Sequence, residues 1–176
     1  MINMKKIYII LSHSGSFPSF IIKNFTRCKY SHVAISLDKS IDKMYTFGRK
    51  KVNNPFVGGF IIESTKSEFY QKFKKTKCLI YALNISNDSY VKLEKILCAF
   101  EKNSSKYRYD IIGLLFKGIN VKVARKNYYV CTDFLSYILK ECDIYTFKKK
   151  VLRPKDFVDI PNQEFIYKGL LLQYKC

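Results

Sequence analysis

The sequence predicts a single α+β domain over residues 1–176, in which an antiparallel sheet packs against helices. The length of 176 residues fits one domain with a real core, and the composition, 48% apolar and 26% charged, is typical of a folded chain. Segments with strand-like patterns cluster together, and segments with helix-like patterns lie around them, which favours the α+β class. No internal repeat and no linker rich in Pro, Gly or Ser divides the chain.

The first half of the chain is predicted to consist mainly of strands. Residues 6–11 form an apolar run that indicates the first strand, and residues 12–27 have the pattern of a turn followed by a helix. Four more strands are expected at residues 31–37, 43–49, 58–64 and 76–85. The first two of these four are joined by a loop short enough for a hairpin, and the last has the dense apolar run of a buried strand.

The second half is predicted to be mainly helical. Asn87 or Asp88 is expected to cap a helix whose apolar residues keep roughly helical spacing up to Phe100. The other expected elements are a second helix at residues 109–119, a third at residues 131–142, a helical turn at residues 153–160 and a last strand at residues 164–174.

The charge of the chain bears on its partners. Lys and Arg number 32 against 14 Asp and Glu, which gives a net charge of +18. Lysine clusters occur throughout the chain and no nucleic-acid-binding signature accompanies them, so no specific nucleic acid binding is expected. Weak association with an anionic membrane surface is the expectation that the charge supports.

The cysteine pattern and the hydropathy exclude several classes of protein. The six cysteines form no C-x-x-C pair and only two histidines are present, so neither a disulfide framework nor a metal site is expected. No segment approaches the roughly 20 apolar residues of a membrane span. The apolar run at residues 7–11 is shorter than the roughly 7 to 15 residues of a signal-peptide core, so a cytoplasmic protein is expected.

Cys131 is the first candidate catalytic residue. Apolar residues follow it at intervals of three and four, which puts Cys131 at the start of a buried helical stripe made of Phe134, Leu135, Ile138, Leu139 and Cys142. The unpaired N–H groups at a helix start stabilise a thiolate and lower the pKa of a cysteine. The alternative is a structural role, because cysteine is among the most buried residue types.

A nucleophilic cysteine needs a base, and only His13 and His32 can supply an imidazole. Period-2 alternation places His32 on a strand face with small side chains. The neighbouring strand of the predicted hairpin brings Thr46 opposite or diagonal to His32, where its hydroxyl could hold the second imidazole nitrogen. The alternative for His32 is a strand-end histidine satisfied by solvent or by the backbone.

These motifs resemble a known family. The sequence "YSHVAISLD", followed by a predicted hairpin and much later by "YYVCTDFLSYIL", resembles the circularly permuted branch of the NlpC-type papain-like cysteine hydrolases, which includes YiiX-like proteins and relatives of lecithin:retinol acyltransferase. The opening "KIYIILSHSGSFPSFII" and the later "RPKDF" resemble corresponding segments of that branch. The resemblance implies a permuted papain-like fold, with Cys131 as the nucleophile and His32 as the base.

The third catalytic position departs from the family pattern. Relatives often carry His, Asn, Gln or Glu on the second strand of the hairpin, whereas this chain offers Thr46. Glu63 is a substitute for this position, although a strand-end glutamate is often merely solvated. Ser12, His13 and Ser14 follow the first strand where relatives line the cleft, so they and Glu63 are the expected substrate-binding residues. An ordinary loop histidine is the alternative for His13.

The resemblance therefore implies a thiol hydrolase, such as a peptidase, amidase or esterase, or an acyltransferase. Its substrate would be a small peptide, a lipid or another acyl compound with an amide, ester or thioester, and neither a metal nor an organic cofactor is implied. Whether water or another nucleophile accepts the acyl group stays open. The competing class is a non-catalytic basic module on the same fold that binds an anionic partner.

Overall fold

The computed structural model describes residues 4–15, 29–51 and 54–175. Of residues 12–27, for which a turn and a helix are predicted, residues 16–27 lie outside the described part of the chain. The described residues form a six-stranded antiparallel sheet with helices packed on it, so the α+β class is confirmed. The strand order is β4-β3-β2-β1-β5-β8, with bounds β1 (Met4–His13), β2 (His32–Ser36), β3 (Met44–Lys51), β4 (Asn54–Glu63), β5 (Lys77–Ser86) and β8 (Glu164–Leu170).

The two central strands explain the dense apolar runs of the sequence. β1 pairs with β2 on one side and with β5 on the other. Its alternate residues enter two different cores, Ile7 and Ile9 into one and Tyr8 and Ile10 into the other. A strand buried on both faces reads as a continuous apolar run rather than as an alternating pattern.

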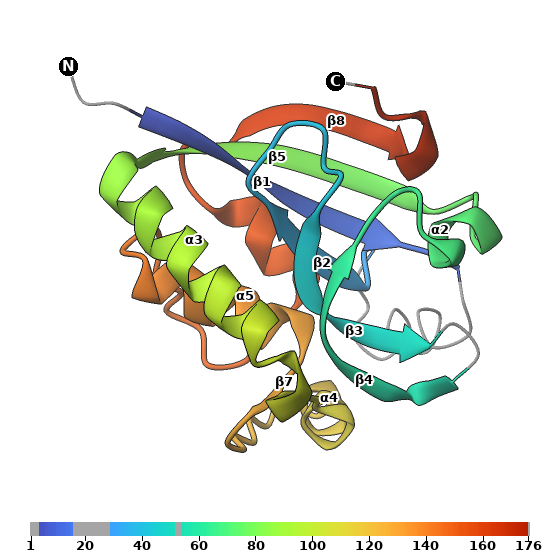
Figure 1. Cartoon of the computed structure of the whole chain (residues 1–176). Coiled ribbons are helices and arrows are strands. Elements are labelled where there is room, and N and C mark those ends of the chain that lie inside the picture. Colours follow the sequence, from blue (N-terminus) through green and yellow to red (C-terminus); the bar gives the residue numbers. More distant parts are fainter. Residues whose placement is uncertain (1–3, 16–28, 52–53, 176) are drawn as a thin grey trace.

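The larger core lies under α3 (Asn87–Lys102) and α5 (Cys131–Glu141). Figure 1 shows these two helices together beside the central strands, whereas α2 (Glu68–Lys72) lies toward the other end of the sheet. The smaller core, on the opposite face, includes Tyr70 from α2 and Leu171 from the 3-10 turn η3 (Leu171–Gln173). The sheet therefore separates two apolar layers, and α5 belongs to the larger one.

The helix ends mostly follow the predictions, with one correction. The N-cap of α3 is Ser86, whose side chain accepts a hydrogen bond from the Ser89 N–H, and not Asn87 or Asp88, which lie in the first turn. A serine oxygen there satisfies an N–H group that has no partner within the helix. The helix predicted at 109–119 is α4 (Ile111–Gly118), and the one at 131–142 is α5.

The last strand, predicted for residues 164–174, ends at Leu170 and is followed by η3, and the 3-10 turn η1 (Ser104–Lys106) was not expected. Three further short elements were not predicted. They are α2 and two strands, β6 (Arg108–Tyr109) and β7 (Tyr128–Tyr129), which pair in parallel. Because β7 ends two residues before Cys131, this small ladder holds both ends of the α4 segment and fixes where α5 begins. The helical turn η2 (Pro154–Asp159) matches the expected turn at residues 153–160.

The α4 helix is anchored at its start by a buried carboxylate. Asp110 is its N-cap and accepts a 2.8 Å hydrogen bond from the Gly113 N–H. Arg125 also pairs with the Asp110 carboxylate, and its guanidinium lies 4.0 Å from the centre of the Tyr128 ring. Among the helices of residues 4–15, 29–51 and 54–175, none combines the length and apolar character needed to cross a bilayer.

Candidate active site

Cys131 is the first residue of α5 and is 5% exposed. The residue before it, Val130, is the N-cap and offers no side-chain hydrogen bond to the helix. The early N–H groups of a helix have no partners within the helix and carry partial positive charge. The Cys131 thiol therefore occupies a position that favours a thiolate, as the sequence pattern predicts.

His32 faces this thiol from the first residue of β2. α5 packs against β2, and the His32 imidazole lies close enough to the Cys131 side chain for each group to shift the pKa of the other. The imidazole is 21% exposed, so one side of it is open to solvent. Its neighbour on the adjacent strand is Ser12, which pairs with His32 in the β1–β2 register.

Glu63, the last residue of β4, holds the other side of the imidazole. Its Oε2 atom lies 3.3 Å from His32 Nε2. The Tyr70 hydroxyl donates a 2.7 Å hydrogen bond to the same oxygen, and the Ser12 side chain lies beside Tyr70. Strands β1, β2, β4 and helices α2 and α5 thus contribute to one chain of polar groups that ends at Cys131.

Gly48 on β3 lies beside this arrangement. A Cβ atom at Gly48 would lie 3.8 Å from His32 Cε1 and 3.7 Å from Glu63 Oε1, which are ordinary van der Waals distances, and within 2.9 Å of Ile61 Cδ1. The backbone of β3 at Gly48 therefore lines the space next to the imidazole and the carboxylate.

The structure corrects the prediction for Thr46. The Thr46 side chain is fully buried, and its hydroxyl donates a 2.8 Å hydrogen bond to the Val33 carbonyl. Gly48, not Thr46, lies beside the imidazole, and the carboxylate of Glu63 reaches His32 Nε2. Glu63, the substitute that the sequence offers, is therefore the residue that contacts His32, whereas Thr46 joins β3 to the backbone of β2.

The predicted substrate-binding residues are only partly brought together. Ser12 is buried and contacts Tyr70, so it supports the polar chain from behind. His13 ends β1 and has its Nδ1 atom 3.2 Å from the Ser31 hydroxyl. Ser14 follows β1 directly. Glu63 contacts His32, and its predicted part in substrate binding stays a prediction.

The pKa directions agree with a thiolate and imidazolium pair. Burial lowers the pKa of His32, but the charge of Glu63 and the hydrogen bonds to Cys131 and Glu63 raise it by more, to about 10. Burial raises the pKa of Cys131, but the hydrogen bond and the charge of His32 lower it by more, so the net shift is downward. Burial also raises the pKa of Glu63, yet His32 and Tyr70 hold it below its ordinary value. All three directions favour the ion-paired state, in which Cys131 is a thiolate, His32 an imidazolium and Glu63 a carboxylate.

Lys117 is a second charge close to the thiol, and no sequence signal distinguished it. It lies on α4, is only 4% exposed, and its Nζ atom donates to Thr132 Oγ1 at 2.7 Å, to Asp133 Oδ1 at 2.7 Å and to the Leu152 carbonyl at 3.4 Å. Thr132 and Asp133 follow Cys131 directly, so the ammonium ties down the first turn of α5. Its charge also lowers the pKa of Cys131.

Tyr109 is another neighbour of the thiol that sequence reasoning missed. Its Cβ atom would lie 2.7 Å from a Cβ atom on Gly58, so the ring stands directly over the β4 backbone. Burial raises the pKa of Tyr109, and the adjacent Cys131 thiol raises it further, although Arg49 opposes this shift. The phenol therefore stays protonated.

The fold and the site define an α+β protein with a cysteine, histidine and glutamate constellation. No group of three or more His, Cys, Asp or Glu side chains in the described ranges could hold a metal ion. No protein-family model matches the chain, and neither a curated protein nor a solved structure matches it.

Proposed function

We propose that this protein is a thiol hydrolase or acyltransferase that acts on an amide, ester or thioester through Cys131, His32 and Glu63. The observation that carries the proposal is the position of the imidazole, which lies between the Cys131 side chain at the start of α5 and Glu63, with its Nε2 atom 3.3 Å from Glu63 Oε2. A nucleophile, a base and a group that orients the base are the parts that thiol catalysis requires.

The reaction would have two halves. The Cys131 thiolate attacks the carbonyl carbon, the sulfur–carbon bond forms and the carbonyl electron pair moves to the oxygen, beside the N–H groups at the start of α5. When the intermediate collapses, the leaving amine, alcohol or thiol takes the proton of the His32 imidazolium. An acceptor then gives a proton to His32 and attacks the thioester, which releases the acyl product and restores the thiolate.

Glu63 would keep the imidazole in place and stabilise its charge. A carboxylate does this better than the hydroxyl of Thr46, because it interacts with an imidazolium as an ion. The Tyr70 hydrogen bond keeps the carboxylate ionised and fixes its direction. The substrates that fit are the small peptide, lipid and other acyl compounds expected from the sequence.

The experiment that tests this proposal follows the reactivity of Cys131 against pH. Iodoacetamide labelling read by site-resolved mass spectrometry should label Cys131 down into mildly acidic solution, where the roughly 8.5 pKa of an ordinary thiol leaves other cysteines slow. His32→Ala removes the cationic partner and should move the Cys131 profile to higher pH. Incubation with p-nitrophenyl acetate should leave an acetyl group on Cys131 in the wild type and none in Cys131→Ser.

The competing class predicts a different outcome. A basic binding module has six unremarkable thiols, no acetyl adduct and retention on a polyanion that falls with salt. Identical Cys131 profiles in the wild type and in His32→Ala, together with no acetyl adduct, would contradict the enzyme proposal and support that module. The net charge of +18 is the observation that favours it.

A further inference from the structure

The α4 helix exposes its apolar side chains and buries a lysine. Its exposed side chains recur at positions i, i+3, i+4 and i+7, which makes one apolar stripe: Ile112 at 48% exposure, Leu115 at 56%, Phe116 at 40% and Ile119 at 67%. The buried residues of the helix include Gly113 and Lys117. A surface helix of an isolated globular protein normally has the reverse arrangement, with apolar residues inside and lysine outside.

The stripe is continuous, which separates it from other exposed apolar side chains. Val121, at 43% exposure, follows three residues after the end of α4, so five exposed apolar residues lie within ten positions of the chain. The remaining large apolar side chains that are exposed in the described part of the molecule, such as Val57 and Val91, stand on separate elements. Single exposed residues are ordinary, but a continuous patch marks a surface that another phase or molecule covers.

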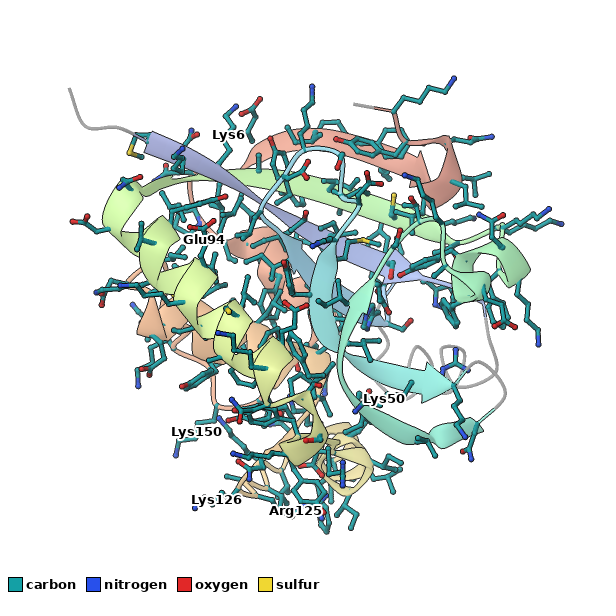
Figure 2. The ribbon with its side chains drawn as sticks, in the orientation of Figure 1. Lys6, Lys50, Glu94, Arg125, Lys126 and Lys150 are labelled. Carbon is teal, nitrogen blue, oxygen red and sulfur yellow. The ribbon has the colours of Figure 1, made fainter. Side chains whose placement is uncertain are left out.

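The charges around the stripe identify what covers it. Between residues 103 and 132 the only acidic residue is Asp110, and it is 2% exposed and paired with Arg125. The exposed charged residues of this stretch are all basic: Lys106, Arg108, Lys122 and Lys126. Figure 2 shows Arg125 and Lys126 at the end of the molecule where α4 and β7 lie, away from β8. An apolar stripe within a segment that exposes basic but no acidic residues is complementary to an anionic lipid surface.

We propose that α4 is an interfacial helix that docks this protein onto an anionic phospholipid bilayer. The stripe from Ile112 to Ile119 would enter the boundary between headgroups and acyl chains, and Arg108, Lys122 and Lys126 would pair with the headgroups. At about 1.5 Å per residue the helix is about 12 Å long, which suits a position in the plane of the interface.

The same helix is joined to the candidate active site. Lys117, on the buried face of α4, bonds to Thr132 and Asp133 in the first turn of α5, next to Cys131. Docking through the outer face of α4 would therefore hold the start of α5 near the bilayer, where a lipid acyl group is presented. The docking itself does not depend on Cys131 being a nucleophile, so the two proposals can fail separately.

Sedimentation with lipid vesicles tests the proposal. The full chain should bind vesicles of phosphatidylcholine with phosphatidylserine and should bind pure phosphatidylcholine vesicles at least about tenfold more weakly, because the basic residues need anionic headgroups. Leu115→Glu and Ile119→Glu should each weaken binding by about tenfold or more, because each puts a carboxylate where an apolar side chain enters the interface. The matched control is Val91→Glu, which places the same charge on an exposed apolar position of α3 and should bind as the wild type does.

The fold of each variant is checked by circular dichroism and by the pH profile of Cys131 labelling. Equal binding by Leu115→Glu, Ile119→Glu and Val91→Glu would overturn the proposal, because the stripe would then make no special contribution. Size-exclusion chromatography with light scattering gives the other decisive outcome. If the wild type self-associates, Leu115→Glu makes it monomeric and vesicle binding is unchanged, then a second copy covers the stripe and the lipid assignment is wrong.

Discussion

Helices α4 and α5 each carry apolar side chains at helical spacing, but they turn these side chains in opposite directions. In α5 the stripe faces the larger core, with Phe134, Leu135, Ile138 and Leu139 all at 0% exposure. In α4 the apolar stripe is exposed and Lys117 is buried. Periodicity shows that a helix has two unlike faces, but contacts with the rest of the fold decide which face is turned inward.

The difference has a local physical cause in Lys117. A buried ammonium is costly unless its donors find partners, and here three acceptors from the α5 start and the η2 side of the fold receive it. Once this lysine is held inside, the residues on the other side of α4 must face outward. The comparison of α4 with α5 therefore shows that a buried, hydrogen-bonded lysine can turn the apolar face of a helix toward solvent.

The largest expected effect is a difference in unfolding free energy between a variant of the α5 stripe and a variant of the α4 stripe. Leu135→Ala removes a fully buried side chain of α5 and should lower the free energy of unfolding by about 2–5 kcal/mol. Leu115→Ala is the matched change in α4, and because Leu115 is 56% exposed it should alter that free energy by no more than about 0.5 kcal/mol. Urea unfolding of both variants measures this. Similar losses in the two would mean that the α4 stripe packs against the protein itself.

A smaller effect is expected from the lysine that distinguishes α4. Lys117→Met keeps the length of the side chain but leaves Asp133 without its ion pair, and should cost roughly 1–3 kcal/mol of unfolding free energy. The cost stays below that of a fully buried pair because the Asp133 side chain is 24% exposed. Lys140→Met, an exposed lysine of α5, is the control and should change stability by less than about 0.5 kcal/mol. Equal stabilities would show that Lys117 does not anchor the two helices.

The smallest expected effect is on the pH profile of Cys131 labelling, which reports which groups lower the pKa of this thiol. Glu63→Gln removes the charge that raises the pKa of His32, so the imidazolium should weaken and the labelling profile of Cys131 should move up by about one pH unit. Thr46→Val should leave the profile in place, because the Thr46 hydroxyl bonds to the Val33 carbonyl. Leu115→Glu should also leave it in place. A larger shift in Thr46→Val than in Glu63→Gln would return the orienting position to Thr46.

Much of the fold follows from local patterns in the chain. The buried strands β1 and β5 and the helix α5 have periodicities that need no knowledge of distant residues. The short elements α2, β6 and β7 escaped prediction, because a two-residue strand or a single short helical turn carries too little periodicity. The cap of α3 was misplaced by one or two residues, since several neighbouring polar side chains can serve as caps.

The candidate site divides in the same way. The position of Cys131 at a helix start, and its direction toward the sheet, depend on the residues that follow it within three turns, so the sequence by itself determined them. Glu63, Tyr70 and Lys117 were decided only by the tertiary structure, because each reaches the site from an element far from Cys131 along the chain. Local patterns determine which residues make up the apolar face of an element and which make up the polar face. The partner that each polar group meets depends on how strands β2, β3 and β4 align and on how α4 is held against α5, and those contacts exist only once the chain has folded.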